Sequence, residues 1–172
     1  MSRRRLDSLS VAIATDFYLS YIPRWLLARE PLRRLNLPPR WTGGGLLGAG
    51  LGWALLPLVP RGGAVEALAV AAAAGAACFV CGRAESALGS HDDPRIVLDE
   101  TVGFWAAAAY QPRSLWSMLA AFALFRLFDA AKPPPIGRLE RLPGGIGVVM
   151  DDVGAGVLAN LVLTAGRRLL RC

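Results

Sequence analysis

The chain has 172 residues, of which 54% are hydrophobic and 19% are charged, and its formal net charge at pH 7 is +6. This length is sufficient for one domain with a core, and the composition is more apolar than that of a typical soluble domain. Three cysteines exclude a disulfide framework. No aromatic platform or recognisable module accompanies the arginines, so we expect no nucleic-acid partner.

Basic charge gathers in the first 41 residues, which hold eight arginines against three acidic residues. From Arg5 to Arg29 the apolar residues recur at roughly helical spacing, which predicts an amphipathic helix at a membrane surface, broken near Pro23. Prolines at positions 31, 38 and 39 then mark a linker. We assign residues 1–41 to a basic amphipathic arm and linker, suited to an anionic membrane surface or, alternatively, to a solvated tail. Charges interrupt the arm before any long apolar stretch, so we expect no cleavable signal peptide.

Residues 42–172 form the second predicted unit, a helical domain embedded in a membrane. The run Trp41–Pro60 is uncharged over twenty residues, and Ala67–Gly82 adds sixteen more. About twenty apolar residues cross the hydrocarbon core of a bilayer, so we expect one or two spans. Six glycines between Gly43 and Gly52 predict that the first segment packs closely against another helix.

Further helices are expected along the rest of the chain, and the predicted fold class is all-α. They cover residues 65–81, 97–110, 115–131 and 146–170. A polar connection at residues 83–95 separates the first two of them. No stretch shows the sustained alternation of polar and apolar residues that is typical of strands. We therefore predict a compact bundle of about five helices behind the amphipathic arm.

The acidic residues are concentrated in the most apolar part of the chain. Eight of the thirteen lie in residues 92–152. Adjacent carboxylates such as Asp151 and Asp152 are unfavourable in an apolar helix unless a cation lies beside them. A divalent metal is the first candidate for that cation, and an interaction with the helix dipole is the alternative. Asp99 and Glu100 form a second adjacent pair and point about a quarter-turn apart, so that one faces the site and the other supports it.

Cationic side chains and glycines accompany the carboxylates. Arg126, Asp129 and Lys132 follow one another at i,i+3 steps and form a stripe on one side of a helix. Lys132 is the only lysine, and its ammonium group suits a phosphate, although an Arg126–Asp129 ion pair is an alternative reading of the stripe. The segment Gly144–Gly147 either brings backbone N–H groups close to an anion or simply starts a helix. Gly156 shares a face with the second of the paired aspartates and is expected to leave room for a ligand there. Hard oxygen ligands beside a lysine and an arginine are what magnesium-assisted phosphate chemistry requires.

Three ordered blocks of sequence contain these residues. The blocks are His91-Asp92 with Ile96–Glu100 and Gly103; then Phe125-Arg126, Asp129, Lys132-Pro133 and Pro135-Ile136; then Gly144-Gly145, Gly147, Met150–Asp152 and Ala155-Gly156. At these residues the chain resembles the phosphatidylglycerophosphatase A family of bacterial membrane lipid phosphatases. The resemblance covers roughly residues 43–165.

The resemblance implies an enzyme, a Mg²⁺-dependent phosphatase that converts phosphatidylglycerophosphate to phosphatidylglycerol in phospholipid biosynthesis. Its partners would be the phospholipid substrate and the bacterial inner (cytoplasmic) membrane, and no oligomeric state is predicted. The expected metal ligands are Asp99, Glu100, Asp151 and Asp152. The expected catalytic residues are Arg126, Asp129, Lys132 and Asp152. The expected substrate contacts are His91, Arg126, Lys132, Gly144, Gly145 and Gly147. Which carboxylate serves as nucleophile or base is left open.

Residue counts narrow the chemistry of such a phosphatase. A cysteine phosphatase needs Cys-x5-Arg, but Ala84 and Ala87 stand where the arginine would follow Cys78 and Cys81. The single histidine excludes a mechanism with two essential histidines. Carboxylates that hold magnesium, with a metal-activated water or a carboxylate nucleophile, remain.

One turn departs from the family pattern. The family has a proline-glycine-threonine-x-glycine-serine turn, whereas this chain reads Pro60-Arg61-Gly62-Gly63-Ala64 and carries neither hydroxyl. Substrate contacts through those hydroxyls are therefore not expected here. Two other functions stay open: a membrane cation carrier, which would also bury carboxylates, and a non-catalytic membrane scaffold derived from the same fold.

Overall fold

The computed structural model describes residues 3–27, 43–90 and 93–170, and within these ranges all regular structure is helical. The arm contains α1 (Arg3–Ala14) and α2 (Tyr21–Leu27). The bundle contains α3 (Gly44–Leu55), α4 (Gly63–Leu88), α5 (Leu98–Ala108), α6 (Leu115–Ala131) and α8 (Gly145–Leu169). Two short elements complete it, the 3₁₀ turn η2 (Leu56–Leu58) and α7 (Ile136–Leu139). The all-α prediction, with five longer helices behind an arm, is confirmed.

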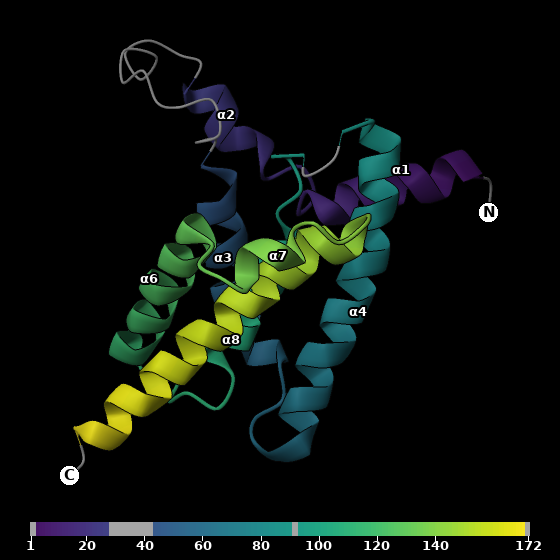
Figure 1. Ribbon diagram of the computed structural model, residues 1–172. Helices are drawn as coiled ribbons and strands as arrows, with labels where there is room; N and C mark the ends of the chain where they lie inside the picture. The colour runs from purple at the N-terminus through teal and green to yellow at the C-terminus, as the bar shows by residue number, and fades with distance from the viewer. Residues whose placement is uncertain (1–2, 28–42, 91–92, 171–172) are drawn as a thin grey trace.

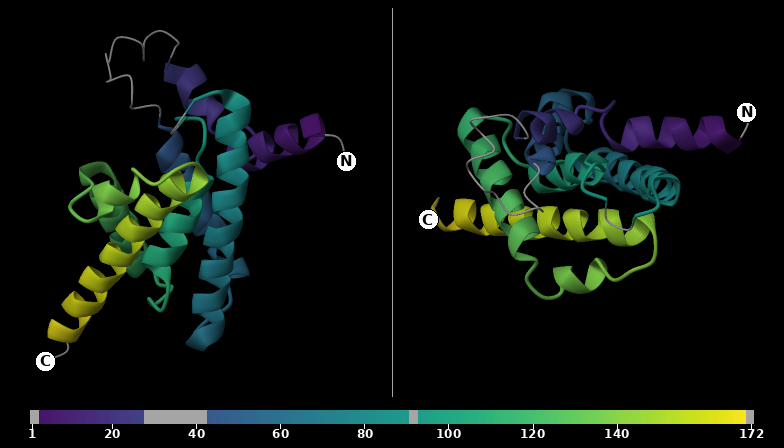
Figure 2. Two further views of the ribbon diagram at one scale, coloured as in Figure 1. Left: turned by 45° about the vertical axis from the view of Figure 1, so that its right-hand side comes forward. Right: turned by 90° about the horizontal axis from the view of Figure 1, so that it is seen from above.

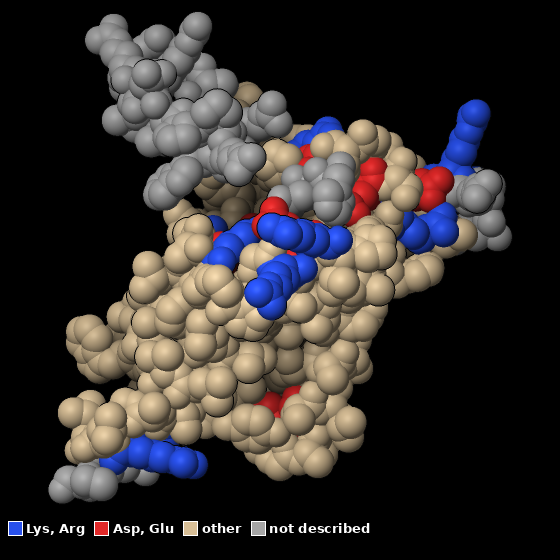
Figure 3. Space-filling view, in the orientation of Figure 1, with Lys and Arg blue, Asp and Glu red and all other residues tan. Residues whose placement is uncertain are grey.

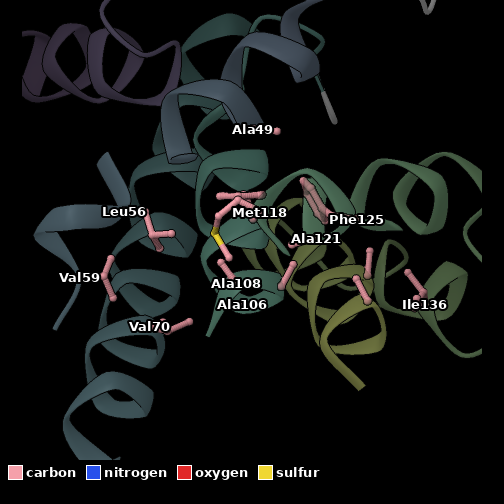
Figure 4. Packing of buried hydrophobic residues seen from close by; sticks show 14 residues of the cluster. Ala49, Leu56, Val59, Val70, Ala106, Ala108, Met118, Ala121, Phe125 and Ile136 are labelled. Atoms are coloured by element: carbon pink, nitrogen blue, oxygen red, sulfur yellow. The ribbon is translucent and has the colours of Figure 1, made fainter. Parts of the chain in front are cut away.

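Helix α5 is the centre of the bundle. It packs against α3, α4, α6 and α8, and α4 and α8 run in opposite directions along the length of the molecule (Figure 1). Phe104 of α5 and Met118 and Phe125 of α6 are at most 2% exposed. Figure 4 shows Met118, Ala121 and Phe125 in one row along α6, facing the interior. The upper end in Figure 1 is where α4 ends and where both α5 and α8 begin.

Glycines let the helix backbones touch. A Cβ added at Gly52 would lie 2.7 Å from the carbonyl oxygen of Thr101, and one added at Gly48 would lie 2.5 Å from that of Val97. The predicted close packing of residues 43–52 is therefore confirmed, with α5 as the partner helix. The prediction for Gly156 was wrong: a Cβ there would collide with the backbone of Gly103, so this face of α8 holds α5 and leaves no room for a ligand.

We expect Gly156→Ala to lower the free energy of unfolding by about 1–3 kcal/mol, because overpacking forces two helices apart. The matched control is Gly75→Ala on α4, where an added Cβ meets no atom within 4 Å. There the better helix propensity of alanine should leave stability unchanged or raise it by up to about 1 kcal/mol. Thermal unfolding in detergent checks both, and a Gly156→Ala protein as stable as the control would refute the close contact.

Two helices, α4 and α8, are long and apolar enough to cross a membrane, with 26 and 25 residues. The uncharged run Trp41–Pro60 is not a span of this kind, since its helix α3 has only 12 residues and ends in η2. Large apolar side chains face outward, among them Leu68 and Phe79 of α4 and Trp116 of α6, which is 79% exposed. Figure 3 shows an uncharged band across the middle of the molecule, with charged side chains above and below it.

The arm lies across the upper end of the bundle. Helix α1 packs against α4, while α7 packs against α8 on the opposite face of the molecule (Figure 2). The predicted break near Pro23 was wrong, because Pro23 lies in the first turn of α2. Backbone N–H groups in the first turn have no hydrogen-bond partner within the helix, so a proline there costs no helical hydrogen bond. The chain instead turns at Asp16–Tyr18, three residues with positive φ.

Candidate active site

Three carboxylates from two helices meet at the upper end of the bundle. Asp99 and Glu100 lie in the first turn of α5, and Asp152 lies in the second turn of α8. One oxygen atom of each lies within 4.8 Å of the others. The two helices bring them together because Gly103 and Gly156 allow backbone contact one turn further along.

The carboxylates of this cluster are largely buried, and two of them have an oxygen atom without a hydrogen-bond partner among the described residues. Asp99 and Asp152 are 7% and 4% exposed. In the described part of the chain, Oε2 of Glu100 and Oδ2 of Asp152 are buried without a hydrogen-bond partner. Burial, followed by the negative charge of Asp99, raises the pKa of Glu100 well above its usual range. Such oxygen atoms fit a hard divalent cation, which would supply the missing positive charge.

Arg126 of α6 borders the cluster. Its Nη1 lies 2.8 Å from Oδ2 of Asp129 and 3.9 Å from Oε1 of Glu100. The i,i+3 ion pair considered from the sequence is therefore present, and it stands directly beside the carboxylates. Gly45 of α3 makes room for this contact, because a Cβ there would lie 2.5 Å from Oε1 of Glu100. Sequence reasoning identified the glycine-rich segment but not this position.

Lys132 and Asp151 form a second charged group. Lys132 follows the last residue of α6 with a left-handed backbone, at φ 41°. Its Nζ lies 2.7 Å from Oδ2 of Asp151 and 3.2 Å from Oε2 of Glu140. Asp151 thus lies against Lys132 and outside the three-carboxylate cluster. Glu140 was missed, because nothing in the sequence indicates that the chain after α7 returns to Lys132.

The glycines that start α8 are closely packed. A Cβ at Gly145 would collide with the backbone of α4 at Cys78, and one at Gly147 would collide with Leu142. The N–H of Gly147 also donates to the carbonyl of Gly144 at 2.9 Å. Packing accounts for glycine at 145 and 147, and the expected substrate contacts of Gly144, Gly145 and Gly147 stay predictions. His91 and Asp92 lie outside the described residues.

The arm is bonded to the segment that leads into α5. Val97 N–H donates to the carbonyl of Ala14 at 2.8 Å, and Ser20 Oγ donates to the carbonyl of Arg95 at 2.6 Å. Asp16, whose pKa burial raises to about 6, accepts a hydrogen bond from Thr101 at 3.2 Å. The arm therefore supports the first turn of α5, which carries Asp99 and Glu100. The sequence did not predict this role.

Ser20→Ala should lower stability by about 1–3 kcal/mol, because it leaves the Arg95 carbonyl without this donor in a part-buried position. Ser8→Ala is the matched control, since the Ser8 hydroxyl donates to the carbonyl of Arg4 within α1, at an exposed position. Thermal unfolding of both variants checks the difference. Equal melting temperatures for the two would show that the arm does not support this segment.

Taken together, the fold and the site define a helical protein with membrane-length helices whose carboxylates and cations gather at one end, an arrangement suited to phosphate chemistry. The sequence model of phosphatidylglycerophosphatase A matches residues 33–167. The chain therefore belongs to the phosphatidylglycerophosphatase A family, a family of phosphatase enzymes.

Relatives agree with this membership. A Haemophilus influenzae protein named phosphatidylglycerophosphatase A is 39% identical over 130 residues, which cover 74% of this chain and 78% of the relative. An Escherichia coli protein of the same name is 37% identical over 87 residues, 49% of this chain and 51% of the relative. A Bacteroides thetaiotaomicron protein named "Putative phosphatidylinositol-3-phosphatase" is 41% identical over 95 residues, 54% of this chain and 59% of the relative. No solved structure matches the chain.

Proposed function

We propose that the protein hydrolyses phosphatidylglycerophosphate to phosphatidylglycerol and inorganic phosphate at a Mg²⁺ site in the bacterial inner membrane. The observation that supports this most is the buried cluster of Asp99, Glu100 and Asp152, with oxygen atoms that lack hydrogen-bond partners in the described chain, beside Arg126. The name of the Haemophilus relative supports the substrate.

Asp99, Glu100 and Asp152 would hold the metal ion, because their oxygen atoms converge. When bound, the ion would polarise the phosphoryl group and make water a stronger nucleophile. Asp151, also predicted as a ligand, is assigned here to Lys132, which it touches at 2.7 Å. With this assignment, Asp151 lies next to Lys132 and Asp152 would lie next to the metal ion, so each carboxylate of the Asp151-Asp152 pair has a cation beside it.

The remaining residues would bind and orient the phosphate. Arg126 can present N–H groups to its oxygen atoms, and Lys132, which contacts Asp151, can add a compact positive charge. Asp129, held by Arg126 at 2.8 Å, is the carboxylate best placed to act as base or nucleophile. The bond between phosphorus and the glycerol oxygen breaks, this oxygen takes up a proton from water and becomes a hydroxyl group, and the released phosphate keeps the oxygen atom of the water.

The charges also favour one orientation in the membrane. At the upper end the described basic residues include Arg83, Arg95, Arg126, Lys132, Arg138 and Arg141, in addition to those of α1, and at the lower end Arg61, Arg113, Arg167 and Arg168. Since the cytoplasmic side of a membrane protein carries the excess of Lys and Arg, the carboxylate cluster would face the cytoplasm.

Phosphate release in detergent micelles tests the proposal. The substrates to compare are phosphatidylglycerophosphate, phosphatidylinositol 3-phosphate and water-soluble glycerol 3-phosphate, each with Mg²⁺ and with EDTA. We expect release from the first lipid that requires Mg²⁺. Release that EDTA leaves intact would remove the metal from the proposal, and preference for the inositol lipid would change the substrate. Cation flux through vesicles without any phosphate release would favour the carrier.

A further inference from the structure

Two cavities lie at the lower end of the bundle, the end opposite the carboxylate cluster (Figure 1). The first, of about 390 Å³, is lined by Arg61, Glu66, Tyr110 and Arg113, among others. The second, of about 230 Å³, is lined by Tyr110, Thr164, Arg167 and Arg168. Tyr110 therefore lines both cavities, and arginines line each of them.

Hydrogen bonds hold the first cavity in shape. The N–H of Tyr110 donates to Oε1 of Glu66 at 3.2 Å, and the N–H of Gly62 donates to Oε2 of the same carboxylate at 2.7 Å. Arg113 donates to the carbonyls of Leu56 and Val59, both at 2.8 Å. The loop before α4 is thus tied to the loop after α5.

Gln111, which lines the first cavity, holds two residues that line the second. Its side chain is buried, with Oε1 accepting from Arg167 at 2.7 Å and Nε2 donating to Thr164 at 3.0 Å. Hydrogen bonds among α4, α8 and the connection that follows α5 therefore fix the positions of residues that line the cavities.

Positive charge is in excess here. Four arginines line the two cavities, and the one carboxylate among the lining residues is Glu66, both of whose oxygen atoms already accept backbone hydrogen bonds. Burial, followed by the positive charge of Arg61, lowers the pKa of Arg113. An anion placed between these side chains would relieve that repulsion.

Exposed apolar side chains lie close in sequence to the residues that line the cavities. Leu58 of η2, Trp116 of α6 and Leu169 of α8 are 76%, 79% and 78% exposed. They belong to the segments that meet at the lower end, and exposed tryptophan and tyrosine are typical of the membrane–water interface. A ligand with a phosphate group and acyl chains matches both the arginines and these exposed apolar side chains.

We propose that the lower cavities bind the head-group phosphate of an anionic phospholipid in the leaflet opposite the carboxylate cluster. Arginine is suited to this task because its planar guanidinium donates two parallel hydrogen bonds to a phosphate. The proposal is one of binding and not of hydrolysis. It shares with the proposed function only the location in a membrane and does not depend on phosphatase activity.

The test uses the full-length protein in neutral-detergent micelles and compares dioleoyl phosphatidylglycerol, dioleoyl phosphatidylcholine and inorganic phosphate. The double variant Arg61→Gln/Arg168→Gln removes two exposed lining charges and leaves Arg113 and Arg167 in their structural hydrogen bonds. The matched control is Arg138→Gln/Arg141→Gln, two exposed arginines in and just after α7, outside both the cavities and the basic arm. Each protein is assayed for the shift in melting temperature that the additive produces.

A ligand that binds the folded state raises the melting temperature. We expect phosphatidylglycerol to stabilise the unmodified protein and the control variant more than phosphatidylcholine does, and the double variant to lose most of that excess. Every protein in the comparison keeps the carboxylate site. Lipid bound at that site therefore shifts the melting temperature of each protein equally and does not affect the difference between them. The proposal is overturned if the double variant keeps the excess, if the two lipids act equally, or if inorganic phosphate alone reproduces the shift. Since turnover is not measured, failure of the lipid site is distinct from failure of the phosphatase proposal.

Discussion

Asp152→Asn and Asp99→Asn are each expected to reduce phosphate release by at least about 10²-fold, the scale of losing an acid–base or metal-binding group. Both changes keep the size of the side chain and remove a charge from the buried cluster. Asp152→Asn removes the charge from a carboxylate whose Oδ2 is buried without a hydrogen-bond partner in the described chain, and Asp99→Asn keeps an oxygen atom that can accept from the N–H of Glu100, so neither should destabilise the fold. The measurement is phosphate release from the lipid, together with thermal unfolding of the same samples.

Glu85→Gln is the matched control for these variants. Glu85 is a buried carboxylate of α4 that lies outside the three-carboxylate cluster. Its variant should retain activity while the two cluster variants lose it. If Asp152→Asn or Asp99→Asn keeps activity within about threefold of the unmodified protein, the loss is far smaller than that of a general acid–base group. Such a result would show that the cluster takes no part in the reaction.

Helix positions could be predicted where local signals agree. Helix α6 occupies residues 115–131 as expected, and Ser114 caps it by accepting a hydrogen bond from Ser117 N–H. Helix α4 extends to Leu88, seven residues beyond its predicted end at Cys81. The last turns of α4 are polar, and for that reason the sequence predicted a loop there. In the structure these turns stay helical, and Arg83 forms an ion pair with Asp7 of the arm at 2.5 Å. A contact between segments 76 residues apart has no local signal.

The candidate site was predictable in composition but not in its division of roles. Adjacent acids in apolar helices indicated a cation site, and Asp99, Glu100 and Asp152 do converge. Which member of the Asp151-Asp152 pair faces α5 depends on the register between two helices. That register is set by backbone contact at Gly103 and Gly156, which periodicity along a single helix cannot reveal.

Lys132→Met is expected to lower turnover by about 10²-fold, comparable to the loss of one charged donor from a transition-state site. It should also destabilise the protein, because Asp151 is 5% exposed and would lose a cation 2.7 Å away. Lys132→Arg keeps the charge and should keep the stability, but its planar group replaces a compact ammonium and should still impair turnover. Full activity in both variants would remove Lys132 from the site.

The double variant Lys132→Met/Asp151→Asn separates the two roles of the lysine. It removes both partners of the ion pair, while the asparagine can still accept the hydrogen bond that Asp151 Oδ1 receives from Asp152 N–H at 3.0 Å. If Lys132 only neutralises Asp151, stability and turnover should both recover relative to Lys132→Met. If Lys132 also binds the phosphate of the substrate, stability should recover and turnover should stay low, because the charge that faces the phosphate is still absent. We expect the second result, and recovery of turnover with stability would assign Lys132 to the ion pair alone.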